Sequence, residues 1–521
     1  MKTSFLALLV AFMLVASMLC GCASGEASDF TLAKTIVPTE DLGLSVGDSL
    51  TEAFKEMTNS NPVSSTIFFA DPTSVEYNGR LYVYGTNDSQ EFDQKMGMGD
   101  NSYGSINTLV CYSTDDMVNW RYETTVPVTE VCTWAGCSWA PSIVSRKEGT
   151  KTHFYLYFCN SAGGVGVLTS TSPTGPWTDP VGGPLVSNDK LGDDPVFWCF
   201  DPGVVIDDNG VGWLAFGGGE PVHADESGMY TGNCRIVRLG KDMASLDSEI
   251  VKVPSIFHFE ANELNYINGT YVLTYCSNYA DRSMWKISWG KEPQTCSMCY
   301  MTSTDPLNPD SWQWGGEYLV NPNNFGFDFS NNHTHLQKFG DKYYILYQNV
   351  SLLMNMGKTG GYRSINVDEI EVDEANVVIK PGTMTRTGVS QIKNPSALDV
   401  TEAETSAVSA GIKYYTDDDR TFVTSIDDGD WIALRGVDFA NGVNSFAATV
   451  RGKGTIEVRL DSPDGKAVGQ IQFSTNGEFA AISCELTKNV SGIHDLYFVL
   501  GGGSFVFDNW QFANILEEVA E

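Results

Sequence analysis

The sequence predicts an all-β protein in which a five-bladed β-propeller is followed by a second, compact β-domain. The first observation behind this prediction is composition: the 521 residues include 51 Gly and 12% aromatic residues, in short Tyr, Val, Phe and Trp runs typical of strands joined by tight turns. The second is a block that recurs five times between residues 61 and 385. The third is a change of pattern over residues 398–515, where aromatic residues thin out and Gly/Asp turns dominate.

The N-terminus is typical of an export signal. Lys2 precedes an apolar run over residues 5–19, and small residues follow it. The Leu-Cys-Gly-Cys ending at residues 19–22 resembles a bacterial lipobox, which implies that Cys22 is acylated and becomes the mature N-terminus. We therefore expect a lipoprotein signal peptide over 1–22, a tether over 23–60 and a lipid-anchored protein at the cell surface. The alternative is ordinary signal cleavage nearby and secretion.

Charge and cysteine usage narrow the function classes. The formal net charge of −33 repels nucleic acid and anionic lipid headgroups, so we exclude both as ligands; it suits action on a neutral polymer, or it serves solubility alone. Cys296 and Cys299 have the spacing of half a zinc site, but no second pair follows. Most cysteines are expected to be small core residues. We expect no organic cofactor and no obligate protein partner.

The repeated block consists of a strand, a tight Asn/Asp/Gly turn and an aromatic strand. Its five copies begin at Asp71, Trp139, Asp201, Glu260 and His333, and this fairly even spacing is what a radial propeller requires. A generic β-sandwich is the alternative, but sandwich strands do not repeat a whole block five times.

Acids stand at the start of three blocks, on the strands expected to line the propeller axis. Asp71, Asp201 and Glu260 are costly to bury there unless they are paired or used. The alternative is that they cap strands, since Asp71 and Asp201 both precede Pro. Hydrolysis of a glycoside without a covalent intermediate needs one carboxylate to activate water and one carboxylic acid to protonate the leaving oxygen. A third acid can orient the proton donor and raise its pKa.

These motifs resemble glycoside hydrolase family 43 over residues 61–385. The matching segments are Ala-Asp-Pro at 70–72, Phe-Asp-Pro-Gly-Val-Val-Ile-Asp-Asp-Asn-Gly at 200–210, Phe-Glu-Ala at 259–261 and Asn-Asn-His at 331–333. The resemblance implies a five-bladed propeller and an inverting mechanism. It implies that Asp71 is the general base, Asp201 the residue that orients and tunes the donor, and Glu260 the general acid, with Glu263 as the rival for that last role.

The same resemblance places His333 at the axis, near a metal ion held mostly by water, for which Ca²⁺ is the leading candidate. The residues after His333 depart from the family's usual pattern. Trp134, Trp139 and Trp198 flank the motifs, and each is expected either to line the substrate site or to pack in the propeller core.

The C-terminal region resembles carbohydrate-binding module family 6 over residues 400–513, which implies a β-sandwich (jelly-roll) over 398–515. The resemblance places Glu402, Glu404 and Asp508 at a structural Ca²⁺ site; the alternative is ordinary acids at strand ends. The family's sugar-stacking Trp is replaced by Phe479, and Tyr414 and Tyr415 are alternative platforms. The domain is therefore expected either to bind sugar weakly or to be a structural partner.

The predicted function is an inverting glycoside hydrolase of the α-L-arabinofuranosidase/β-xylosidase type. It would release arabinofuranose or xylose from plant hemicellulose or arabinan, as polysaccharide or oligosaccharide. One alternative is an endo-acting arabinanase. A second, from another class, is a catalytically inactive glycan-binding surface lipoprotein, against which the presence of all three acids argues.

Overall fold

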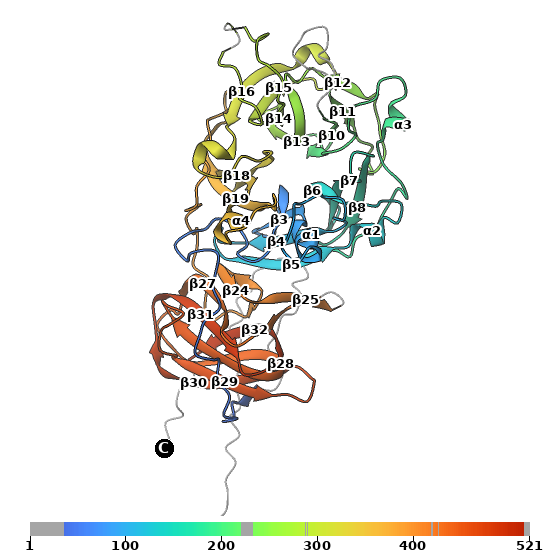
Figure 1. Ribbon diagram of the computed structural model, residues 1–521. Helices are drawn as coiled ribbons and strands as arrows, with labels where there is room; N and C mark the ends of the chain where they lie inside the picture. Colours follow the sequence, from blue (N-terminus) through green and yellow to red (C-terminus); the bar gives the residue numbers. More distant parts are fainter. Residues whose placement is uncertain are drawn as a thin grey trace, which may run out of the picture.

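The computed structural model describes residues 36–219, 233–286, 288, 290–417, 420–425 and 427–514. Within these ranges the chain forms a ring of five β-sheets above a separate β-domain (Figure 1). The predicted lipidation site Cys22 and the predicted signal peptide lie outside the described residues. None of the described helices is long and apolar enough to cross a membrane.

Each sheet of the ring is an antiparallel blade, and its first strand lies next to the first strands of the neighbouring blades. Blade one contains β2 (Ala70–Tyr77), β3 (Arg80–Thr86), β4 (Leu109–Thr114) and β5 (Trp120–Val126), and blade two contains β6 (Trp139–Glu148), β7 (Lys151–Cys159) and β8 (Val165–Ser170). Blade three contains β9 (Gly203–Ile206), β10 (Gly212–Phe216), β11 (Cys234–Arg238) and β12 (Val251–Val253). Blade four contains β13 (His258–Ile267), β14 (Thr270–Ser277), β15 (Met298–Ser303) and β16 (Gln313–Leu319), and blade five contains β17 (Thr334–Phe339), β18 (Lys342–Asn349) and β19 (Ser364–Ile370). The predicted five-bladed propeller is confirmed.

Short elements connect and follow the blades. They are α1 (Asp88–Gln94), α2 (Val128–Val131), α3 (Asn188–Leu191), η2 (Pro309–Ser311), η3 (Pro322–Phe325), α4 (Ser351–Asn355) and the hairpin of β20 (Val372–Asp373) and β21 (Val378–Ile379).

The hairpins form where the sequence places Asn-Gly. Asn78 and Gly79 have φ values of 52° and 75°, and Asn268 and Gly269 have 47° and 79°. Two consecutive left-handed residues make the type I′ turn whose twist matches that of the strands it joins. The aromatic second strands then pack between blades: Phe154 and Phe158 of β7 share a buried cluster with Tyr84 of blade one. Local turn chemistry and burial between blades thus explain why one block repeats around the ring.

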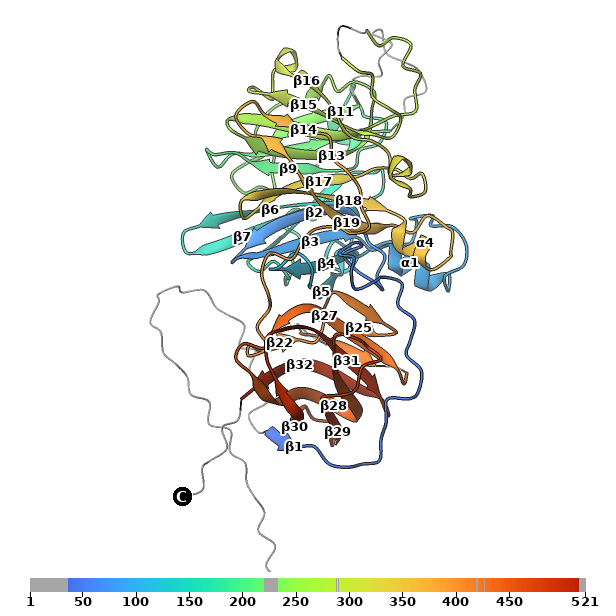
Figure 2. The ribbon, with the colours of Figure 1, turned by 90° about the vertical axis from the view of Figure 1, so that its left-hand side faces the viewer.

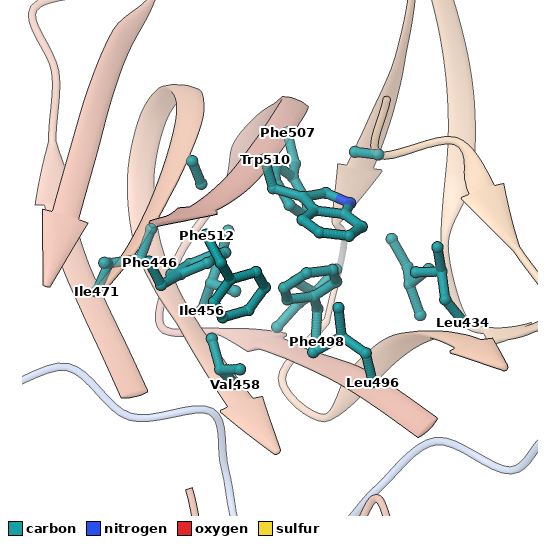
Figure 3. Close-up of a cluster of buried hydrophobic side chains, with 14 of the residues drawn as sticks. Leu434, Phe446, Ile456, Val458, Ile471, Leu496, Phe498, Phe507, Trp510 and Phe512 are labelled. Carbon is teal, nitrogen blue, oxygen red and sulfur yellow. The ribbon is translucent and has the colours of Figure 1, made fainter. Parts of the chain in front are cut away.

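The C-terminal domain is an antiparallel β-sandwich, as predicted. Its strands are β22 (Thr401–Glu402), β24 (Val408–Ala410), β25 (Lys413–Asp417), β26 (Arg420–Ser425), β27 (Asp430–Asp438), β28 (Val443–Leu460), β29 (Gly469–Ser474), β30 (Ala480–Val490), β31 (Ile493–Gly501) and β32 (Phe505–Ala513). The long strand β28 pairs with β30 and β32 along its first half and with β29 and β31 along its second half. Figure 3 shows the aromatic core between the sheets, built around Phe446, Phe498, Trp510 and Phe512.

The two domains are joined by main-chain pairing. The short strand β23 (Thr405–Ser406), just after the sandwich begins, pairs with Trp120 and Arg121 of β5 and so adds a strand to blade one. The ring of Tyr414 stacks on that of Tyr122, with centroids 4.3 Å apart and planes at 2°. Figure 2 shows the sandwich directly against the outer edge of this blade. The sandwich is therefore an extension of blade one rather than a domain on a loose linker.

The segment predicted as a tether, residues 23–60, is in fact bound to the sandwich from Ile36 onward. Strand β1 (Ile36–Pro38) pairs in parallel with β30, Val46 is buried against Trp431, and Thr51 Oγ1 donates a hydrogen bond to Asp430 at 2.7 Å. Figure 2 shows this segment running along the sandwich to the propeller. The apolar residues of this segment are too widely spaced to show the period of a strand or a helix, so the sequence did not reveal the packing. They are still sufficient to pack the segment against the sandwich.

The ten cysteines among the described residues are free thiols, and eight of them are buried. This agrees with the prediction of core residues. Cys296 and Cys299 are both buried, and within the described ranges no group of three or more His, Cys, Asp or Glu side chains could hold a metal ion.

Candidate active site

Two of the three candidate catalytic acids, Asp71 and Asp201, stand where the inner strands begin, at strained backbone positions. Asp71 and Asp201 have φ values of 54° and 47°, and the corresponding residues of blades two and four, Ala140 and Ala261, have 40° and 62°. Left-handed φ is unfavourable for residues with a side chain and is found preferentially at functional sites. The strand registers shift at the same points in blades one, two and four, so each bulge re-aims the side chain that follows it.

Glu260 is offset by one residue from the other two acids, so the prediction that all three are equivalent was wrong for this one. The left-handed position of blade four belongs to Ala261, and Glu260 precedes it, at the place that Ala70 holds in blade one. The sequence hides this offset because the bulge is a backbone feature. Its consequence is exposure: Asp71 and Asp201 are each 6% exposed, whereas Glu260 is only partly buried.

Asp71 is surrounded by hydrogen-bond donors. Its carboxylate accepts hydrogen bonds from Arg363 Nη1 at 2.8 Å and Thr86 Oγ1 at 2.6 Å, and His333 Nδ1 lies at 3.2 Å. Its backbone N–H donates to Gln348 Oε1 at 2.8 Å. Burial favours the neutral acid, but Arg363, His333 and Thr86 outweigh it and hold the pKa of Asp71 well below its usual range. Asp71 is therefore ionised at any physiological pH.

Arg363 is a site residue that the sequence did not reveal. It lies one residue before β19, and its Nε and Nη2 donate to the two oxygens of Asp88, both at 2.9 Å. Asp88 is fully buried at the start of α1 and fixes the guanidinium, while Nη1 reaches Asp71. Asp71 and Arg363 are 292 residues apart in sequence, and a single Arg beside an apolar strand gives no pattern from which to predict the contact.

Asp201 accepts hydrogen bonds from the strand that carries Glu260. One carboxylate oxygen accepts the backbone N–H of Ala261 at 2.8 Å, and the Asn262 side chain donates to the Asp201 carbonyl at 3.0 Å. Burial raises the pKa of Asp201 to about 6, with Asp71 adding to the rise and His333 and the Ala261 N–H opposing it. The Ala261 contact places Asp201 beside Glu260. Its pKa near 6 means that Asp201 is mostly ionised at neutral pH.

The surroundings of Glu260 favour its neutral form. Burial, followed by the charges of Asp201 and Asp71, raises its pKa well above the usual value. Among the described residues, no side chain forms a hydrogen bond with the Glu260 carboxyl. Its rival Glu263 is 2% exposed and accepts a hydrogen bond from His335 Nδ1 at 2.8 Å, which engages it inside the sheet. The geometry favours Glu260 as the proton donor.

The histidine and tryptophans predicted at the site differ in their placement. His333 touches Asp71, and this contact raises its pKa although burial opposes the rise. Trp139 donates to the Tyr103 carbonyl at 3.0 Å and packs with Trp198 against a small cluster of Ala140, Cys159 and Phe200 beside the acids. Trp134 instead donates to Asp179 at 2.9 Å and stacks on Phe158, in the packing between blades one and two.

The three acids of the predicted calcium site lie at the junction of the two domains, far from the catalytic group in the fold. Glu402 and Glu404 are buried, and both oxygens of Glu404 and one of Glu402 have no hydrogen-bond partner. Asp508 accepts two hydrogen bonds from Arg420 Nη2, at 2.7 and 2.8 Å. Burial raises the pKa of Glu402 to about 7 and raises the pKa of Glu404 well above its usual value, while Arg121 of blade one opposes both shifts.

The aromatic residues predicted as sugar platforms on the sandwich are largely engaged with other side chains. Tyr414 is stacked on Tyr122, so one face of its ring is covered. Phe479 packs on Phe422, and the Arg451 guanidinium lies 4.6 Å from its ring centroid. Of the three candidates, only Tyr415 is exposed.

Comparisons with known proteins agree with this architecture. Residues 59–377 match the model of glycosyl hydrolases family 43, and residues 402–514 match that of carbohydrate binding module (family 6). An arabinoxylan arabinofuranohydrolase of Bacillus subtilis (strain 168) is 38% identical over 88% of this chain and 93% of its own length. A protein of the same name from Paenibacillus polymyxa is 34% identical over 87% of this chain and 74% of its own length.

The fold of a solved relative is also similar. The crystal structure of a glycoside hydrolase family 43 arabinoxylan arabinofuranohydrolase from Bacillus subtilis, in complex with cellotetraose, has a TM-score of 0.80 at 36% identity. The match covers 89% of this chain and 99% of that chain, so it includes both domains. Both predicted family resemblances are confirmed.

Proposed function

Because the chain belongs to glycosyl hydrolase family 43, we propose that it releases L-arabinofuranose side groups from arabinoxylan with inversion of configuration. The observation that carries the chemistry is the opposite tuning of two carboxyl groups: Asp71 is held ionised by Arg363 and His333, and Glu260 is held protonated by burial and by Asp201. An ionised base and a neutral acid are what single displacement at a glycosidic carbon requires. The two arabinoxylan-active relatives, matched along most of the chain, support the choice of substrate.

Each residue has a distinct part in the proposed reaction. Asp71 removes a proton from water as the water attacks the anomeric carbon, and Glu260 delivers its proton to the departing oxygen of the xylan chain. Asp201 stays ionised beside Glu260 and keeps the pKa of that acid high until the proton is needed. Arg363, locked by Asp88, keeps Asp71 ionised until it accepts the proton of the attacking water.

The test of this proposal is a comparison of substrates. Purified full-length protein is incubated with arabinoxylan, debranched arabinan, nitrophenyl α-L-arabinofuranoside and nitrophenyl β-D-xyloside, with Asp71→Asn as the inactive control. We expect free arabinose from arabinoxylan and from the arabinofuranoside. Xylose release as the dominant activity would show a xylosidase, shortening of arabinan would show an endo-arabinanase, and no release from any substrate would favour a glycan-binding protein.

We also propose that Ca²⁺ binds at Glu402, Glu404 and Asp508. The support is chemical: the three carboxylates influence one another electrostatically in a buried place and three of their oxygens lack a partner, although as they are placed they do not form a group of three ligands that could hold a metal ion. Such a set is destabilising unless a cation or protons neutralise it. The Arg420 contact of Asp508 is the competing source of neutralisation.

Calorimetry shows whether calcium or Arg420 neutralises these carboxylates. Added Ca²⁺ should raise the melting temperature of the full-length protein, and chelator should lower it. Glu404→Gln should abolish the calcium response. An unchanged melting temperature in the wild-type protein, with no calcium in the purified sample, would assign neutralisation to Arg420 and Arg121. The predicted axial Ca²⁺ near His333 stays a prediction, to be checked in the same metal analysis with His333→Asn.

Finally, we propose that acylation of Cys22 anchors the enzyme at the outer surface of the cell membrane. The support is the lipobox-like ending of the N-terminal apolar run. Expression of the full gene in a bacterial host with labelled palmitate should give a labelled protein in the membrane fraction, and Cys22→Ser should remove the label. An unlabelled wild-type protein released to the medium would show ordinary signal cleavage.

A further inference from the structure

Two buried thiols lie side by side in blade four, next to the strand that carries Glu260. Cys276 is near the end of β14 and Cys296 stands two residues before β15, and both are fully buried in the same hydrophobic cluster. Their side chains are in hydrogen-bond contact. Cys276 is also the strand partner of Glu260 in the pairing of β13 with β14. The two thiols therefore belong to the framework that supports the catalytic acids.

A backbone irregularity brings the two side chains together. Ser277 faces two consecutive residues: its N–H donates to the Ser297 carbonyl at 2.8 Å, and its carbonyl accepts the Cys296 N–H at 3.0 Å. Cys296 has a left-handed φ of 48°. Two residues opposite one, the first of them left-handed, form a β-bulge, which changes the direction of a side chain. The bulge accounts for the contact of Cys296 with a thiol whose regular strand partner is Met298.

Other buried thiols of the described chain have contacts of a different kind. Three of them contact side chains that carry oxygen: Cys111 with Tyr84, Cys132 with Asp179 and Cys159 with Asp201. A disulfide requires two cysteines whose Cβ atoms lie about 4 Å apart and whose side chains point toward each other. The contact of Cys276 with Cys296 joins one thiol to another, so it meets the second of these requirements directly.

The predicted export of the chain supplies the conditions for oxidation. A chain that carries an N-terminal export signal reaches the oxidising exterior before it has folded, so thiols that are buried later can still react there. In the folded protein, burial and the neighbouring thiol raise the pKa of Cys276 well above its usual value. The thiolate is the species that exchanges, so a bond formed during folding is protected afterwards from small thiols.

We propose that Cys276 and Cys296 form a disulfide bond in the exported protein, which closes the connection from β14 to β15 beside the catalytic acids. Two S–H bonds break and one S–S bond forms. The two electrons and two protons pass to an external disulfide, which is reduced to two thiols. The bond restricts the unfolded chain and the local opening of blade four, so it stabilises the strand that faces Glu260. It does not depend on which sugar the enzyme releases.

Peptide mapping tests the bond itself. The full-length protein is exported from a bacterial host, alkylated, and digested with trypsin without reduction; Arg282 and Lys291 lie between the two cysteines, so trypsin separates them. We expect a linked pair of peptides that disappears on reduction and in Cys276→Ser. Cys299→Ala is the matched control, because Cys299 is equally buried but its strand partner is Tyr275, and the link should persist in it. Exported wild-type protein with both cysteines alkylated, or a link that is lost in Cys299→Ala, would overturn the proposal.

Thermal melting measures what the bond contributes. Reductant should lower the melting temperature of the wild type and of Cys299→Ala by several degrees and leave that of Cys276→Ser unchanged, because this variant has no bond to lose. Both cysteines are buried, so the initial rate on nitrophenyl α-L-arabinofuranoside should stay within twofold in reductant, whereas the half-life of activity just below the melting temperature should shorten several-fold. Equal responses of wild type and Cys276→Ser would overturn the stabilising role. Linked peptides in a protein that releases no arabinose would overturn the proposed function and keep the disulfide.

Discussion

The Arg363–Asp71 contact offers the sharpest test of how the site is tuned. Arg363→Met removes the guanidinium that lies 2.8 Å from Asp71 and keeps a side chain of similar length. The cation lowers the pKa of both Asp71 and Asp201, so its removal raises both values. When the pKa of the base rises, the base becomes protonated, and the enzyme therefore inactive, at a higher pH. The acid limb of the pH–kcat/KM profile should therefore move upward.

The size of the shift follows from the geometry. Two unit charges whose centres lie about 4 Å apart interact by about 4 kcal/mol at an effective dielectric constant near 20, or roughly three pKa units. Arg363 also serves Asp88, and His333 and Thr86 remain beside Asp71, so the expected rise for Asp71 is about two units. Asp201, on which Arg363 is a minor influence, should rise less.

The assay is kcat/KM on nitrophenyl α-L-arabinofuranoside between pH 2 and 8, in wild type, Arg363→Met and Arg363→Lys. Breaking a buried pair destabilises a protein by about 3–5 kcal/mol, so folding is checked by thermal melting at each pH. Arg363→Lys keeps the charge but loses the fork on Asp88, so its acid limb should stay near that of wild type. An acid limb that does not move in Arg363→Met, with activity reduced equally at every pH, would refute electrostatic tuning and leave Arg363 a positioning residue.

Two further predictions concern the acids directly. Asp71→Asn and Glu260→Gln should each lower turnover by roughly 10²–10⁴-fold, and substrates with good leaving groups should partly rescue Glu260→Gln. Glu263→Gln is the control, which should keep the wild-type pH profile because Glu263 is paired with His335. Wild-type turnover in Asp71→Asn or Glu260→Gln would contradict the role of that residue. The carboxyl groups of Asp71 and Glu260 should lie ~6.5–9.5 Å apart in a crystal structure, and proton NMR should show inverted product first; a separation near ~5 Å with retained product would contradict single displacement.

The propeller could be predicted because its signals are local. Asn78-Gly79 and Asn268-Gly269 each specify a hairpin within a few residues, and the aromatic strand after each turn must be buried. The path of residues 36–60 could not be predicted from the sequence. Val46 is buried by Trp431 and its neighbours, which lie almost 400 residues later, so residues 36–60 show no periodic pattern of their own. A segment without a period of its own follows whatever surface covers its few apolar side chains.

The site divides in the same way. Asp71, Asp201, Glu260 and His333 were found because each begins a repeat, and the structure brings them together. The offset of Glu260 was hidden because a left-handed Ala261 is a property of the bulge and not of alanine. Arg363 and Asp88 were missed because their pairing depends on three-dimensional closure of the ring between blades one and five. Sequence repeats thus reveal the candidate reacting groups, whereas the side chains that contact them and shift their pKa values come from parts of the sequence that show no repeat.

The stack of Tyr414 on Tyr122 predicts that the two domains unfold together. Tyr414 packs against the core of the sandwich and the core between blades one and five, whereas Tyr415, its neighbour on β25, points the other way and is 49% exposed. Truncating a fully buried large ring costs about 3–5 kcal/mol, so truncation of the partly buried Tyr414 should cost somewhat less, and truncation of an exposed ring less than about 0.5 kcal/mol. Tyr414→Ala should therefore lower the melting temperature by several degrees and split the calorimetric transition, whereas Tyr415→Ala should leave it single and unshifted.

Equal effects of the two substitutions, or two transitions already in the wild-type protein, would contradict this coupling. A single transition that depends on Tyr414 would mean that β23 and Tyr414 fix the sandwich to blade one in one orientation. Any glycan bound by the sandwich would then be held at a constant distance from Glu260. The sandwich would then hold the polymer in one orientation relative to the propeller rather than on a flexible linker.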